Sequence, residues 1–189
     1  MPPICAWYPM EADWEFEIGG DAPVIDAYWP GFVDLRNDVA RAADLIECGQ
    51  LPALADALVR LNEARSPVWT SKVDLFTPDC IDPYELGSTG DSAGAALACY
   101  IDLLPRSDQQ WGAPGEVSSD CEWICDRLHA LRLSDCRIDL VIRRAFSGSH
   151  TQDLGVTAYL TACSKGVGGA TARLSECLKA FVDTLVPEK

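Results

Sequence analysis

The chain has 189 residues, a net charge of −14, 48% hydrophobic residues and 23% charged residues. Disordered and fibrous proteins have a different composition, and a chain of this length can bury a substantial core. We therefore expect one globular domain over residues 1–189.

The negative charge lies almost entirely in the first half of the chain. Residues 1–91 hold 17 acidic and 5 basic residues, a net charge of −12, whereas residues 92–189 hold 12 and 10, a net charge of −2. An acidic protein repels phosphate backbones and anionic lipids, so we expect binding to neither nucleic acid nor membranes. The nine cysteines are odd in number and irregularly spaced, and no apolar run would cross a bilayer, which favours a reducing cytoplasm.

The first third of the chain predicts one strand and two helices. Apolar and acidic residues alternate over residues 14–18, which is typical of a strand with one buried face. Proline and glycine predict a loop over residues 21–33. Apolar residues at helical spacing then predict a helix over 34–49, capped by Asp34, and a second helix that starts at Pro52.

The middle of the chain predicts a strand, a loop and a helix. Residues 68–76 are rich in β-branched and aromatic residues and predict a strand. Residues 77–91 form a long acidic loop, and loops of this length in compact domains are commonly functional. We expect a small-residue helix from Ser92 to Pro105, followed by an irregular stretch over 105–117.

The last third predicts a helix, a hairpin and a closing helix. Ser119 and Glu122 make a capping box for a helix that continues to about residue 131. Residues 137–146 and 154–163 predict a β-hairpin, and residues 169–186 the final helix. The fold class is therefore α+β, with a mixed or mainly antiparallel sheet of about four strands and about five helices packed on it.

A short serine motif is the main catalytic candidate. Residues 90–94 read Gly-Asp-Ser-Ala-Gly, which matches G-x-S-x-G and resembles the serine esterases of the α/β-hydrolase fold. That resemblance implies a triad of Ser92, Asp139 and His150. Because residues 84–89 make a poor core strand and no oxyanion segment precedes the motif, we interpret Ser92 as a helix cap and assign no catalytic residues.

Two further motifs suggest a metal and an anion. Cys121, Cys125 and His129 are spaced by four along one predicted helix, but residues eight apart lie about 12 Å apart along the axis, too far for one zinc ion. We therefore expect no metal and no cofactor. The glycine turn after the second hairpin strand could cradle an anion at a helix N-terminus. The residues of that turn are Lys165, Gly166, Gly168 and Gly169.

The acidic half of the chain favours a basic protein as the partner. Carboxylates steer a cationic surface toward them, and interleaved aromatic side chains can anchor it. The expected partner-binding residues are Glu15, Glu17, Trp29, Asp34, Asp38, Asp79, Asp82, Tyr84 and Glu85. In size and charge the chain is similar to small acidic immunity proteins that neutralise basic toxins.

The leading hypothesis is therefore a non-enzymatic cytoplasmic protein that binds a basic protein partner, with immunity or antitoxin activity as its most concrete form. The alternative is a small hydrolase, or an anion- or nucleotide-binding protein, that uses the 90–94 loop or the 166–169 turn.

Overall fold

The structure, a computed structural model, describes residues 10–88, 94–106, 114–131, 133–146 and 152–187. Within them, six strands form one mixed sheet, an α+β architecture as predicted but with more than the expected four strands. The strands are β1 (Glu11–Glu17), β2 (Ile25–Asp26), β3 (Val68–Phe76), β4 (Ala95–Pro105), β5 (Cys136–Phe146) and β6 (Gln152–Ser164).

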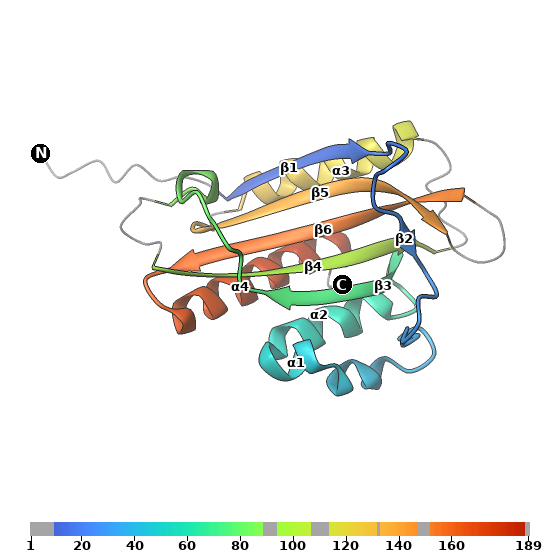
Figure 1. Ribbon diagram of the computed structural model, residues 1–189, viewed down its shortest axis with the longest axis horizontal. Helices are drawn as coiled ribbons and strands as arrows, with labels where there is room; N and C mark the ends of the chain where they lie inside the picture. Colours follow the sequence, from blue (N-terminus) through green and yellow to red (C-terminus); the bar gives the residue numbers. More distant parts are fainter. Residues whose placement is uncertain (1–9, 89–93, 107–113, 132, 147–151, 188–189) are drawn as a thin grey trace, which may run out of the picture.

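The sheet order is β1-β5-β6-β4-β3, with the short β2 also paired to β5 (Figure 1). The predicted hairpin is confirmed, because β5 pairs antiparallel with β6 from Cys136 to Phe146. β4 and β3 continue the antiparallel arrangement, whereas β1 and β2 pair parallel to β5. The N-terminal strand therefore lies beside a strand more than a hundred residues later in the chain.

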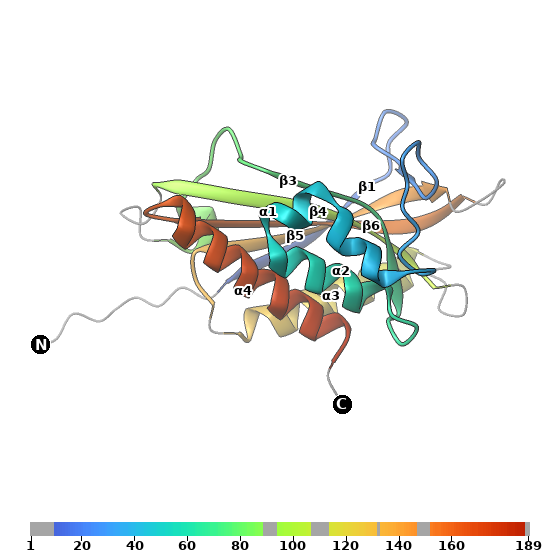
Figure 2. The same cartoon turned by 90° about the horizontal axis from the view of Figure 1, so that it is seen from below.

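The α-helices cover only one face of this sheet (Figures 1 and 2). The helices are the 3-10 helices η1 (Val39–Asp44) and η2 (Tyr84–Leu86) and the α-helices α1 (Ile46–Gln50), α2 (Pro52–Asn62), α3 (Pro114–His129) and α4 (Val167–Leu185). The main core lies between α2, α3, α4 and the sheet, and alternate strand residues such as Ile138, Leu140 and Leu160 point into it. Within the described residues, no helix is long and apolar enough to cross a membrane.

The predicted helix over 92–105 is wrong, because residues 95–105 form the strand β4 at the centre of the sheet. Alanine favours a helix locally, but Leu97, Cys99, Ile101 and Leu103 also alternate with period two, and these residues pack on the helix layer. Pairing with β3 on one side and β6 on the other gives hydrogen-bond partners to the backbone groups on both sides of β4, so tertiary pairing overrides the local preference.

Two helix boundaries also differ from the prediction. The expected helix over 34–49 is divided into η1 and α1, because Leu45 between them has an extended backbone and Asp38, rather than Asp34, accepts the capping hydrogen bond from Ala40 N–H. The expected capping box at Ser119 lies inside α3, where the Ser119 hydroxyl donates to the Gly115 carbonyl of the preceding turn. The predictions for α2 and α4 are confirmed.

Two segments cross the face that the helices leave uncovered. Figure 2 shows residues 18–34 rising above the sheet at one end and part of residues 77–88 at the other, both on the side opposite the helices. We call them the strap (18–34) and the η2 segment (77–88). The strap covers a second small core that includes Ile25, Trp69 and Leu104. The indole N–H of Trp29 donates to the Ser71 carbonyl and holds the strap against β3.

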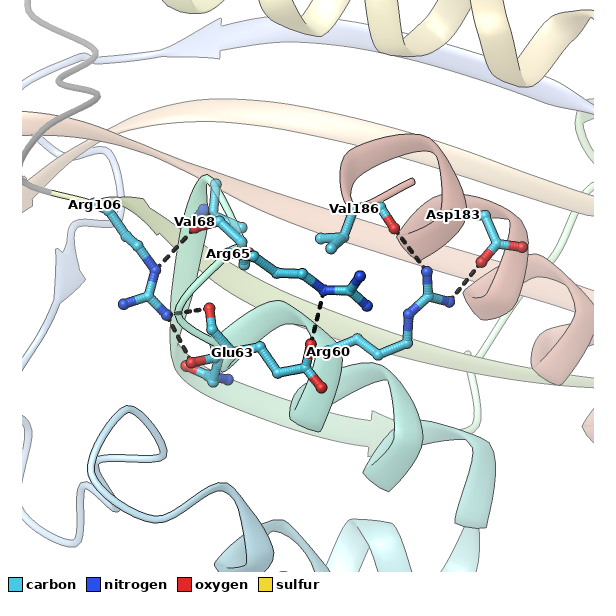
Figure 3. A network of polar contacts seen from close by, with 9 residues as sticks. Arg60, Glu63, Arg65, Val68, Arg106, Asp183 and Val186 are labelled. Carbon is cyan, nitrogen blue, oxygen red and sulfur yellow. Dashed lines mark hydrogen bonds and ion pairs between the residues drawn. The ribbon is translucent and has the colours of Figure 1, made fainter. Parts of the chain in front are cut away.

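Arginine side chains donate hydrogen bonds to carbonyl groups at the C-terminal ends of two helices (Figure 3). Arg106, after β4, donates to the carbonyls of Asn62, Glu63 and Ser66 at the end of α2. Arg60 of α2 donates to Asp183 and to the Val186 carbonyl at the end of α4. Because the last carbonyls of a helix lack intrahelical partners, these contacts bind both helices to their neighbours.

Candidate functional site

The uncovered face of the sheet, between the strap and the η2 segment, is the candidate functional site. One transverse row of direct register partners crosses all five long strands: Asp13 of β1, Asp139 of β5, Tyr159 of β6, Tyr100 of β4 and Asp74 of β3. Directly paired residues in neighbouring strands point to the same face of a sheet. The row therefore places two tyrosine rings, with centroids 5.8 Å apart, between aspartates on both sides.

Carboxylates dominate this face. Glu11, Asp13, Glu15 and Glu17 alternate along β1, and Asp139, Asp102 and Asp74 add to them from β5, β4 and β3. Positive charge comes from Arg137, Arg143 and Lys72. Within the described part of the chain, Glu11 and Glu15 form no ion pair.

Arg137 lies among acids from three elements at the η2 end of the face. Its guanidinium binds Asp139 two residues along the same strand, at 2.6 Å in the closest contact. This hydrogen bond is the main reason that the pKa of Arg137 is raised, and the charges of Asp139, Glu85 and Asp13 raise it further. The η2 segment therefore brings Glu85 close to the acids of β1 and β5.

A pocket of about 360 Å³ lies at the other end of the face, where the strap meets the sheet. Arg143, whose side chain is 11% exposed, forms its wall and makes an ion pair with Glu17. Its other amino group donates to the hydroxyls of Thr157 and Tyr159, both at 3.1 Å. The Thr157 hydroxyl in turn donates to Asp102 at 2.6 Å.

Asp102 at the floor of this pocket is a buried carboxyl group. It is 8% exposed, and its desolvation raises its pKa, although the Thr157 hydrogen bond and the charges of Arg143 and Lys72 act in the opposite direction. A buried carboxyl group costs folding free energy that an apolar residue at the same position would not. A buried carboxyl group with a raised pKa at the floor of a pocket is a candidate functional group.

The predicted partner-binding residues are placed in three groups. Glu15 and Glu17 lie on β1 and Trp29 in the strap, at or beside the uncovered face. Tyr84, which is 79% exposed, and Glu85 belong to η2, and Asp79 and Asp82 lie just before it.

The third group is held within its own segment of the chain. Asp34 pairs with Arg36, whose guanidinium stacks on Trp69 beneath the strap, and Asp38 caps η1. The hydrogen bond with Arg36 lowers the pKa of Asp34. These two carboxylates are therefore engaged by their own segment of the chain.

The segment after the G-x-S-x-G motif differs from that of an esterase elbow. Ser92 and His150 lie outside the described residues, and Asp139 is bound by Arg137. A strand, rather than the helix that the elbow requires, follows Gly94. A Cβ atom at Gly94 would lie 2.4 Å from the Lys165 carbonyl oxygen, so close backbone packing explains the glycine.

The predicted anion turn lies next to Gly94, whose N–H donates to the Ser164 carbonyl. Gly166 is the N-cap of α4 and supplies no side-chain cap, and Gly168 and Lys165 are exposed. A Cβ atom at Gly169 would lie 2.2 Å from the Ser164 hydroxyl oxygen, which again gives a packing reason for glycine.

The cysteines of α3 point into the core. Burial raises the pKa of both the Cys121 and the Cys125 thiols to about 12, which disfavours the thiolate that a metal requires. His129 accepts a hydrogen bond from Ala12 N–H of the edge strand β1 through Nε2. Among the described residues, no group of three or more potential ligands could hold a metal ion.

Sequence reasoning missed most of this site. Sequence patterns assign no function to Asp102, Tyr100 or Tyr159, and they predict only a strand for Arg137 and Arg143. A signal is present in β5, where Arg137, Asp139 and Arg143 share one face of the strand while the alternating residues from Cys136 to Ile142 on the other face are apolar. Charged groups on one face of a central strand indicate that nothing in the fold covers that face.

No protein-family model matches the chain, and neither the curated proteins nor the solved structures contain a significantly similar one.

Proposed function

We propose that the protein is a non-enzymatic binding protein whose uncovered sheet face receives a basic protein partner. The most concrete form of this proposal is a cytoplasmic immunity or antitoxin protein that blocks a basic toxin by direct binding. The observation that carries it is the row of carboxylates along β1, continued across the sheet by Asp139 and Asp74 and supplemented by Glu85 of η2.

Charge complementarity supports a basic occupant. Carboxylates that lack an internal cation, as Glu11 and Glu15 do within the described residues, gain more from an external cation than acids that are already paired. The opposite, helix-covered side of the sheet has internal ion pairs such as Arg60–Asp183 and Lys179–Asp183. A cationic surface is therefore attracted more strongly to the uncovered face.

Aromatic groups supply the anchors that charge alone lacks. The Tyr100–Tyr159 pair lies in the middle of the row, and Tyr84 projects from η2 at its border. A partner arginine can stack on a tyrosine ring while its guanidinium binds the aspartates beside it. We therefore expect arginine to contribute more than lysine to the partner's contact surface.

A binding assay with matched charge variants tests this proposal. The tagged protein captures its partner from the native host at low salt, and the identified partner is then titrated against purified variants. The test variant is Asp13→Asn with Glu15→Gln on the uncovered face. The control is Glu116→Gln with Glu122→Gln, two exposed acids on α3 that remove the same charge from the helix-covered side.

We expect the β1 variant to bind the partner at least about tenfold more weakly than the wild type, and the α3 control to bind it as the wild type does. The affinity of the wild type for the partner should fall as the salt concentration rises. Equal loss in both variants would mean that only net charge matters. Binding that is indifferent to salt, or no basic partner at low salt, would refute the proposal.

A further inference from the structure

The pocket beneath the strap contains hydrogen-bond donors that the acidic surface around it does not explain. Its walls are the strap residues Pro23, Val24, Ile25 and Trp29, and its floor and rim are polar side chains from β3 to β6. Its volume of about 360 Å³ is in the range of small-molecule sites, which combine apolar walls with a few convergent polar groups.

Two cations determine how the tyrosine hydroxyls at the rim are oriented. An arginine or lysine can only donate hydrogen bonds, so a hydroxyl in contact with one must accept. Arg143 donates to the Tyr159 hydroxyl at 3.1 Å. The Lys72 ammonium nitrogen lies 5.7 Å from the centroid of the Tyr100 ring, and its interaction with the Tyr100 hydroxyl is the main reason that the pKa of Lys72 is raised.

Each of these hydroxyls therefore keeps its own hydrogen to donate. No acceptor for either hydrogen is found in the part of the chain that the structure describes. Thr157 differs, because its hydrogen is already given to Asp102. Two free O–H donors, on rings 5.8 Å apart and next to the Lys72 ammonium group, form a receptor for an oxyanion.

We propose that this pocket binds a small molecule with one carboxylate and a compact apolar body, the carboxylate held by Tyr100, Tyr159 and Lys72 and the apolar body by the strap. A single negative charge fits better than two, because Glu17 already neutralises Arg143 and leaves Lys72 as the one unpaired cation among the described pocket residues. Trp29 offers a flat wall for an aromatic or branched group.

Asp102 makes this binding depend on pH. An ionised Asp102 beneath the site repels a second carboxylate, whereas protonated Asp102 does not, and burial already favours its protonated form. The charged and titratable groups that face the pocket around Asp102 are Lys72, Tyr100, Arg143 and Tyr159, with Glu17 behind Arg143 and Asp26 at the rim. Affinity for a carboxylate therefore rises as pH falls toward the pKa of Asp102.

Calorimetric titration of the full chain with benzoate and isobutyrate tests the site, with uncharged benzyl alcohol as the matched probe. Tyr100→Phe and Tyr159→Phe each keep the ring and remove one donor, so each lowers carboxylate affinity at least about tenfold. Tyr84→Phe, which changes an exposed tyrosine on η2, leaves the affinity unchanged. Asp102→Asn binds more tightly at neutral pH and loses the pH dependence.

Any of three results would overturn the proposal. These are no saturable binding of either carboxylate up to about 10 mM, benzyl alcohol binding as well as benzoate, or equal affinities in the three Tyr→Phe variants. The result is independent of the basic partner, because the partner assay changes Asp13 and Glu15 of β1 whereas this one changes the rim of the strap pocket. Either proposal can therefore fail while the other stands.

Discussion

Replacing Arg106 with methionine removes the guanidinium group that donates hydrogen bonds to the C-terminal end of α2. The guanidinium donates to the carbonyls of Ser66 at 2.9 Å, Asn62 at 2.6 Å and Glu63 at 2.7 Å (Figure 3). Asn62 and Ser66 are each 2% exposed, so water cannot easily replace the lost donors there, whereas Glu63 lies nearer the solvent. Methionine keeps most of the apolar volume, which isolates the hydrogen bonds.

The expected loss follows from those two buried carbonyls. At about 1–1.5 kcal/mol for each acceptor left without a donor, the free energy of unfolding falls by about 2–3 kcal/mol. For a domain of this size the midpoint of thermal unfolding falls by roughly 5–10 °C. Arg106→Lys keeps the charge near the helix end but cannot reach all three carbonyls, so we expect about half of this loss.

Urea and thermal unfolding followed by circular dichroism measure the effect. The control is Arg65→Met, which removes a neighbouring arginine whose side chain is 47% exposed and which pairs with the side chain of Glu63 (Figure 3). An exposed pair of this kind contributes less than about 1 kcal/mol. If Arg106→Met costs no more than Arg65→Met, then the helix-closing contacts of Arg106 do not stabilise the fold and the reasoning is wrong.

Three further predictions concern glycines, pH and thiols. Gly94→Ala places a Cβ atom 2.4 Å from a backbone oxygen, so the free energy of unfolding measured in urea should fall by about 1–3 kcal/mol. Gly168→Ala meets open space, so the free energy of unfolding should rise by about 0.4–1 kcal/mol. Equal effects of the two substitutions would contradict the packing explanation. Burial raises the pKa of Asp102 above 3.8, so the folded chain binds the proton of this carboxyl group more tightly than the unfolded chain does. The contribution of Asp102 to the free energy of unfolding therefore falls as pH rises. The urea midpoint of Asp102→Asn should therefore rise relative to the wild type between about pH 4 and pH 7, and a constant difference would count against a raised pKa. Alkylation followed by peptide mass spectrometry should modify exposed Cys80 much faster than Cys121, whose thiol pKa burial raises to about 12, and comparable rates would mean that α3 opens readily.

The elements with strong local patterns were predictable from the sequence. Residues 68–76 form a strand because β-branched and aromatic residues suit a pleated, half-buried surface, and the apolar stripe of α4 has helical spacing. β4 was missed because alanine-rich segments favour helices when isolated, while its strand conformation depends on two neighbours distant in the sequence. The parallel pairing of β1 with β5 carries no local signal at all.

Of the candidate site, the sequence by itself determined the excess of carboxylates in the first half of the chain and their alternation along β1. Only the tertiary structure decided that Asp13 lies beside Asp139, and that Tyr159 and Tyr100 separate them from Asp74. The reason is physical: strand register sets which side chains share a face, and register depends on backbone pairing between segments far apart in the chain. The burial of Asp102 beneath the strap likewise depends on two segments meeting, which residue spacing alone does not specify.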